Sequence, residues 1–123
     1  MIDLSKEIGG ILSDYSAEVA EAMQKSVEEV TKKTVKKLKA SKSMFGGTGK
    51  YAQNWTSDVE KGHVTVSAVI YGKAPTYRLA HLLEHGHAKR GGGRTRPIIH
   101  IKPVEEWAID EVQRKLKEKV ESL

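Results

Sequence analysis

The N-terminal third of the chain carries apolar residues at intervals of three or four positions, starting at Leu4. This spacing is typical of one face of an α-helix and predicts a long amphipathic helix over about residues 4–40. Gly9 and Gly10 weaken its first turns, because glycine costs about 1 kcal/mol inside a helix. The remaining 30 or so residues would form a rod of about 45 Å. Such a rod is longer than a domain of this size, so part of its stripe is expected to pack on something beyond its own sheet. The apolar positions in this part of the stripe are Ile11, Tyr15, Val19, Met23, Val27 and Val30.

A change of period marks the middle of the chain. Residues 41–50 are rich in serine, glycine and lysine and predict a loop. Beyond it, apolar residues alternate with polar ones on both sides of Lys61-Gly62, which is typical of two strands joined by a turn. The pattern predicts a β-hairpin over about residues 54–71, with 54–60 paired to 63–71.

Three further elements are expected after the hairpin. A short helix over about residues 77–85 has Thr76 as a plausible N-cap and Gly86 just past its end. Isoleucines between Pro97 and Pro103 predict a third short strand over about 97–102. A stripe from Val104 to Val120 predicts a C-terminal helix over about 103–122. The fold class is therefore α+β, a small antiparallel sheet packed by three helices.

Length and composition narrow the class of protein. The 123 residues are enough for one domain with a single core, and 38% hydrophobic with 30% charged residues predicts a folded, soluble chain. There is no cysteine, which excludes disulfides, zinc thiolate sites and cysteine nucleophiles. The first ten residues hold two acids and two glycines instead of an apolar run, so we expect neither a signal peptide nor a membrane segment.

The positive charge is concentrated in two segments. The net charge is +5, yet residues 31–50 hold seven lysines and no acid, and residues 84–102 hold five basic residues against one acid. The rest of the chain is therefore acidic. Two basic patches could meet DNA or an acidic protein face, although lysines at a helix C-terminus are also an ordinary solvated feature.

One short motif has the spacing of a zinc site. His81, Glu84 and His85 match H-x-x-E-H, in which two histidines on one helix face bind zinc and the glutamate acts as a base. His87 and His100 could add ligands to a structural site. The competing interpretation, which we favour, places three leucines of this helix in the core and leaves the histidines at the surface. Those leucines are Leu79, Leu82 and Leu83.

Other catalytic patterns fail on inspection. The run Gly46–Tyr51 lacks the first glycine and the Ser/Thr of a phosphate loop, and it follows a predicted helix instead of a strand. No serine lies in a G-x-S-x-G context. We therefore assign no catalytic residue, no metal ligand and no cofactor.

The least ordinary segment is the basic, glycine-rich loop over residues 86–96. It is long and polar for a loop inside a compact domain, which is typical of functional or mobile segments. It could track a phosphate backbone or serve as an arm that orders against a neighbouring subunit. The candidate assembly loop comprises His87, Lys89, Arg90, Gly91, Gly92, Gly93, Arg94 and Arg96.

Four motifs in a fixed order carry a resemblance. After the long helix come G-K-Y-A-Q-N-W (49–55), the hairpin, L-L-E-H-G-H (82–87) and R-P-I-I-H-I-K-P (96–103), followed by the last helix. In this order the chain resembles the small tail-component family of long-tailed bacteriophages and prophages, whose members act in tail completion or head–tail joining. The positions that carry the family motifs are Tyr51, Trp55, Leu83, Glu84, His85, Gly86, Pro97 and Pro103.

The resemblance implies an α+β fold, no catalysis and no cofactor. It implies a homo-oligomeric ring, commonly of six copies, in the virion at the head–tail junction, after assembly in the host cytoplasm. In such a ring the apolar stripe from Ile11 to Val30 would be the candidate subunit interface. The implied partners are the connector and tail-tube proteins, with non-specific contact to traversing DNA and none to a membrane. Within this reading, Glu84 belongs to a helix-end motif and is expected to pair with a basic neighbour such as Arg96.

Two other functions remain open from the sequence. The first alternative is a small DNA-binding or DNA-packaging accessory protein that uses both basic patches, and its binding should weaken steeply with salt. A zinc hydrolase built on His81, Glu84 and His85 is the third.

Overall fold

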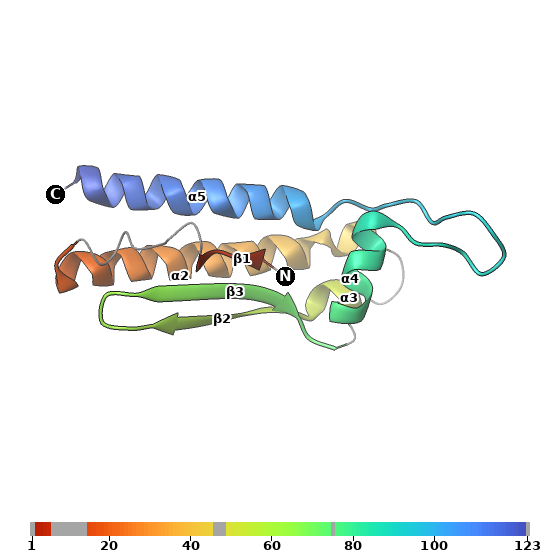
Figure 1. The fold of residues 1–123 in the computed structure, drawn as a ribbon, viewed down its shortest axis with the longest axis horizontal. Coiled ribbons are helices and arrows are strands. Elements are labelled where there is room, and N and C mark those ends of the chain that lie inside the picture. Colours follow the sequence, from red (N-terminus) through yellow and green to blue (C-terminus); the bar gives the residue numbers. More distant parts are fainter. Residues whose placement is uncertain (1, 6–14, 46–48, 75, 123) are drawn as a thin grey trace.

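The computed structural model describes residues 2–5, 15–45, 49–74 and 76–122. Two long helices and a three-stranded sheet form the body, and short helices gather at one end (Figure 1). In chain order the elements are β1 (Ile2–Asp3), α2 (Ala17–Ala40), the 3-10 helix η2 (Ser41–Met44), α3 (Lys50–Gln53), β2 (Trp55–Lys61), β3 (Val66–Gly72), α4 (Thr76–His85) and α5 (Ile101–Glu121).

The sheet is antiparallel, with the strand order β1-β3-β2. The predicted hairpin is present, and its register runs from Trp55 opposite Gly72 to Lys61 opposite Val66. Its turn is closed by the Gly62 N–H, which donates to the Thr65 carbonyl at 2.9 Å. The fold class expected from the sequence, a small antiparallel sheet with a long, a short and a C-terminal helix, is confirmed.

The third strand is not the one expected. We placed it at residues 97–102, but residues 97–100 have no regular structure and Ile101 begins α5. The third strand is instead β1, where Ile2 lies opposite Ile70. The physical reason lies at the start of α5, where the N–H groups of residues 100–102 are bound by a side chain of α4 and are not available to a sheet.

The long N-terminal helix also starts later than predicted. Ser16 has an extended backbone, and its Oγ accepts the Val19 N–H at 3.4 Å, which makes it the N-cap of α2. Leu4 extends β1, since its N–H donates to the Ala68 carbonyl at 3.0 Å. Ile11 and the two glycines before it lie outside the described residues.

Helix α2 forms the middle layer of the molecule. It packs on β2 and β3 with one side and on α5 with the other (Figure 1). Two-sided packing explains why polar residues such as Thr31 and Thr34 are buried, each donating its hydroxyl to the backbone carbonyl four residues earlier. On α5, the predicted stripe supplies the buried Ala108, Val112 and Leu116.

This packing uses the apolar stripe that we assigned to a neighbouring subunit. Met23, Val27 and Val30 are at most 1% exposed within the single chain, so a neighbour cannot reach them. Tyr15 and Val19 are partly buried against the same core. The stripe is therefore a core feature, because α2 is covered by both the sheet and α5.

Candidate functional site

A buried carboxylate joins α4 to the start of α5. Glu84 is 6% exposed, and its Oε1 accepts the N–H groups of His100 and Ile101 at 2.8 and 2.9 Å. Its Oε2 accepts the Lys102 N–H at 3.0 Å. These donors belong to the first turn of a helix, where N–H groups lack partners within the helix and favour a negative charge. Glu84 thus caps α5 from another element.

The electrostatics of Glu84 agree with this role. Burial alone would raise the pKa of its carboxyl group, but three backbone N–H donors and the nearby His100 together lower that pKa below its ordinary value. The carboxylate is therefore charged at neutral pH. We expected it to pair with Arg96; that expectation is wrong, since Glu84 binds His100 and the α5 backbone, and Arg96 is exposed.

His100 extends the contact to a third segment. Its Nδ1 lies 2.7 Å from the Ile98 carbonyl and 3.0 Å from Glu84 Oε1, and its Nε2 lies 2.6 Å from the Tyr51 hydroxyl. Both neighbours of Nδ1 are acceptors, so Nδ1 carries a proton, and Nε2 shares a hydrogen bond with the Tyr51 hydroxyl. The ring of Phe45 packs edge-on against the same imidazole, with the two ring centroids 4.9 Å apart.

Tyr51 is held in this cluster on its backbone side as well. Its carbonyl accepts the Thr76 hydroxyl at 2.7 Å, so Thr76 ties α4 to α3 and its hydroxyl does not cap its own helix. Burial and the neighbouring Glu84 raise the pKa of the Tyr51 hydroxyl. The Tyr51–His100–Glu84 chain resembles a catalytic hydroxyl, imidazole and carboxylate, but the His100 side chain is fully buried and faces no substrate surface.

The motif positions of the sequence largely converge on this junction. The Leu83 carbonyl accepts the Ile98 N–H at 2.8 Å. Gly86 has φ +75°, and Pro97 packs directly beside it. Trp55 is buried in the core, with its Nε1 unpartnered among the described atoms. Sequence reasoning missed the role of His100, although its place inside the R-P-I-I-H-I-K-P motif was a usable signal.

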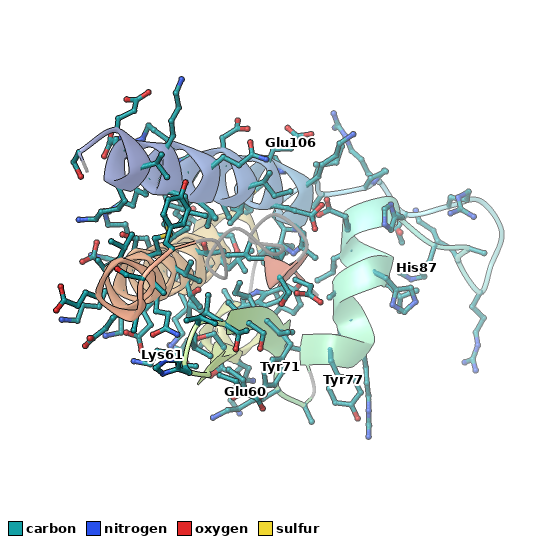
Figure 2. The ribbon with its side chains drawn as sticks, turned by 60° about the vertical axis from the view of Figure 1, so that its left-hand side comes forward. Glu60, Lys61, Tyr71, Tyr77, His87 and Glu106 are labelled. Atoms are coloured by element: carbon teal, nitrogen blue, oxygen red, sulfur yellow. The ribbon has the colours of Figure 1, made fainter. Side chains whose placement is uncertain are left out.

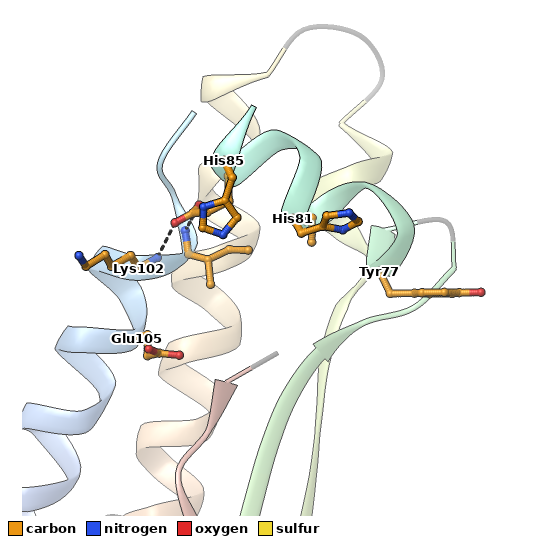
Figure 3. Close-up of a pocket in the computed structure, with 8 residues that line it drawn as sticks. Tyr77, His81, His85, Lys102 and Glu105 are labelled. Carbon is orange, nitrogen blue, oxygen red and sulfur yellow. Dashed lines mark hydrogen bonds between the residues drawn. The ribbon is translucent and has the colours of Figure 1, made fainter. Parts of the chain in front are cut away.

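The H-x-x-E-H motif does not have the geometry of a zinc site. His81 and His85 are exposed at the edge of an open cavity of about 440 Å3 between α4 and α5, and Lys102 and Glu105 lie on its other side (Figure 3). Glu84 is committed to backbone donors and cannot act as a base. Within the described ranges, no group of three or more His, Asp or Glu side chains is placed to hold a metal ion.

The leucines of α4 are also placed differently from our expectation. Its buried positions are Thr76, Ala80 and Glu84, whereas Leu79 is 42% exposed and Leu82 and Leu83 are half-buried. Tyr77, on the first turn of α4, is 54% exposed and points away from the body (Figure 2). Helix α4 thus turns small and polar residues inward and large apolar ones outward.

The basic loop is a short hairpin-like arm. Ala88 and Arg94 form an isolated bridge, and the Lys89 N–H donates to the Gly93 carbonyl at 2.9 Å. At its base, the His87 N–H donates to Thr95 Oγ1 and the Thr95 N–H to the His87 carbonyl. The arm (residues 86–96) projects from the α4 end of the molecule (Figure 1). The residues of the candidate assembly loop all lie in this projecting arm. All of them are exposed except His87, which is half-buried.

Together, the fold and this site define a small α+β protein whose polar motif residues hold elements together. Comparison with known proteins gives the family. Residues 6–86 match the family described as "Bacteriophage HK97-gp10, putative tail-component", and the chain belongs to it. The resemblance drawn from the sequence motifs is thereby confirmed. No curated protein and no solved structure matches the chain. In the described part of the chain, no helix has the length and apolar character needed to cross a membrane.

Proposed function

We propose that this protein is a non-enzymatic virion component that completes the tail or joins it to the head, and that it works as a ring, commonly of six copies. Membership of a tail-component family supports the setting. One observation carries the proposal further. The large apolar or aromatic side chains exposed in the described ranges all belong to η2, α4 and the segment before α5. They are Met44, Tyr77, Leu79 and Ile99.

These elements occupy one end of the molecule, next to the projecting arm (Figure 1). Removing an exposed leucine or tyrosine from water contributes about 1–2 kcal/mol, so several such residues are enough to favour a contact. The subunit contact therefore moves from the α2 stripe, which is buried, to the α4 end. A contact between this end and a different face of the next copy is heterologous, and a heterologous contact builds a ring when the rotation between copies closes.

The proposal makes the connector and the tail tube the partners of the two ring faces. The structural use of the polar residues supports a non-enzymatic role. Glu84, His100 and Tyr51 hold the start of α5 against α4 through their hydrogen bonds. Because the arm connects α4 to α5, these contacts also fix the orientation of the arm. A rigid mounting for a projecting arm suits an assembly protein, because it holds the arm in a defined direction.

Native mass spectrometry over a range of concentrations tests the ring. Wild-type protein should give one closed oligomer, and Leu79→Glu should shift it to monomer because a charge replaces an apolar contact. Gln113→Glu is the matched control, since Gln113 is exposed on α5 and should leave the oligomer intact. The proposal would be contradicted if the wild-type protein were a monomer at every concentration and bound neither the connector nor the tail tube.

A further inference from the structure

The fold brings two basic segments to one end of the molecule. Helix α2 and η2 end beside α3, which in turn packs against α4, from which the arm projects (Figure 1). The contacts of His100 with Tyr51 and Phe45 fix this arrangement, because they join the segment after α2 to the segment after the arm. We call six of the exposed cations of these two segments the basic end, three from the end of α2 and η2 and three from the arm. Its members are Lys36, Lys39, Lys42, Lys89, Arg90 and Arg94.

None of these six cations is in an ion pair with any carboxylate in the described part of the chain. The exposed ion pairs are made by other cations, on α5 and at the hairpin turn. These are Lys61, Arg114, Lys115 and Lys117. Unpaired cations of one sign repel each other, and a concentration of them on one surface is the electrostatic footprint of a polyanion partner.

The arm's composition distinguishes between the possible polyanions. Protein interfaces draw most of their energy from large side chains buried at the centre, but Ala88 is the only apolar side chain between Gly86 and Arg96. Phosphate contacts need only cations and backbone N–H groups. The arm also has no aromatic residue on which an unpaired base could stack. This favours a duplex backbone over an acidic protein and over single-stranded DNA.

The arm's backbone supports close approach to phosphate. The positions where Gly91, Gly92 and Gly93 would carry a Cβ have no atoms within 4 Å, and Gly92 and Gly93 have φ of +104° and +76°. Glycines in such a turn let a ligand reach the main chain, between flanking side chains that carry the charge.

We propose that the basic end binds the phosphate backbone of double-stranded DNA without sequence preference, with the arm as its reaching element. This surface is additional to the ring contact, which uses the apolar residues of η2 and α4. The free protein is sufficient to test it, so its failure and the failure of the ring proposal are distinguishable.

The test is fluorescence anisotropy with a labelled 20-bp duplex between about 50 and 200 mM salt, the range in which six phosphate contacts lose about 10^3-fold in affinity. The arm variant replaces Lys89, Arg90 and Arg94 with Gln. Its matched control replaces three exposed lysines of α2 and α5 outside the basic end with Gln. They are Lys25, Lys117 and Lys119. Circular dichroism checks that both variants fold.

The slope of log K against log salt is negative, and in the arm variant its magnitude should decrease by about 2.7, at about 0.9 per lost phosphate contact. Its affinity at 50 mM salt should fall at least tenfold, and the control should change less than threefold. Three results would each overturn the proposal: no salt-dependent binding by wild type, equal losses in the two variants, or tighter binding to poly-L-glutamate than to the duplex. The last result would identify an acidic protein face as the partner.

Discussion

Glu84 and His100 are joined twice: Oε1 of Glu84 accepts the backbone N–H of His100 at 2.8 Å and lies 3.0 Å from its Nδ1. One buried residue of α4 therefore sets both where α5 begins and how the imidazole before it is turned. Since the arm connects these two helices, the same contact closes its base. The mounting of the arm depends on this pair.

Replacing Glu84 tests the cap directly. Glu84→Gln removes the charge and presents an amide NH2 to backbone donors, so a buried N–H loses its acceptor. We expect the free energy of unfolding to fall by about 1–3 kcal/mol in urea titrations. Glu106→Gln, at an exposed position of α5, should change it by less than about 0.5 kcal/mol. Equal effects of the two substitutions would refute the capping role.

The same contact predicts a pH dependence. The pKa of Glu84 is lower in the folded protein than in an unfolded chain, where it is about 4.3. Its contribution is therefore complete above that value and is lost as the pH falls through the folded pKa. The stability difference between wild type and Glu84→Gln should shrink between pH 6 and pH 3 in thermal melts. A difference that stays constant or grows with acid would show that the carboxylate charge is not involved.

Two glycines of the arm should respond differently to alanine. Gly86 has φ +75°, and an added Cβ would lie 2.6 Å from the Thr95 carbonyl oxygen. The backbone conformation alone costs an L-residue about 1–2 kcal/mol, so Gly86→Ala should destabilise by at least that amount in urea titrations. Gly91→Ala is the control, because its Cβ would enter open space. If Gly91→Ala were the more harmful change, the described arm geometry would be wrong.

Tyr51 and Tyr71 form a matched pair for removal of a hydroxyl. Tyr51→Phe leaves the buried Nε2 of His100 without its hydrogen-bond partner and should cost about 1–3 kcal/mol. Tyr71→Phe removes a hydroxyl whose pKa is raised by its hydrogen bond to Asp58 near solvent, and should cost little. In an ultraviolet titration, Tyr51→Phe should remove the last tyrosine to ionise, since burial and Glu84 raise the pKa of Tyr51. Loss of an early-ionising tyrosine would contradict this placement.

The spacing of apolar residues was enough to predict the helices and strands that bury one regular face. The hairpin and the apolar face of α5 follow from spacing alone, and both are present. The sequence contained a signal for the start of α2, because Ser16 is a preferred N-cap residue followed by a helical pattern. We placed the start earlier because the apolar spacing continues on both sides of Ser16.

What the sequence could not show depends on contacts between distant segments. Ile98 and Ile99 have strand character, but a carboxylate sixteen residues before His100 captures the following N–H groups and starts a helix. The α2 stripe resembled a free surface because nothing local indicates that α5 packs on α2 opposite the sheet. The basic segments looked like two patches, and only the fold places them at one end.

We propose that this chain forms the junction between head and tail. Cryo-electron microscopy of particles from the phage or prophage that encodes it would show where the chain lies. We expect a ring of density at the junction that fits copies of this fold, with α4 at the contact between neighbouring copies. Mature particles in which the chain is absent, or lies away from the junction, would contradict it.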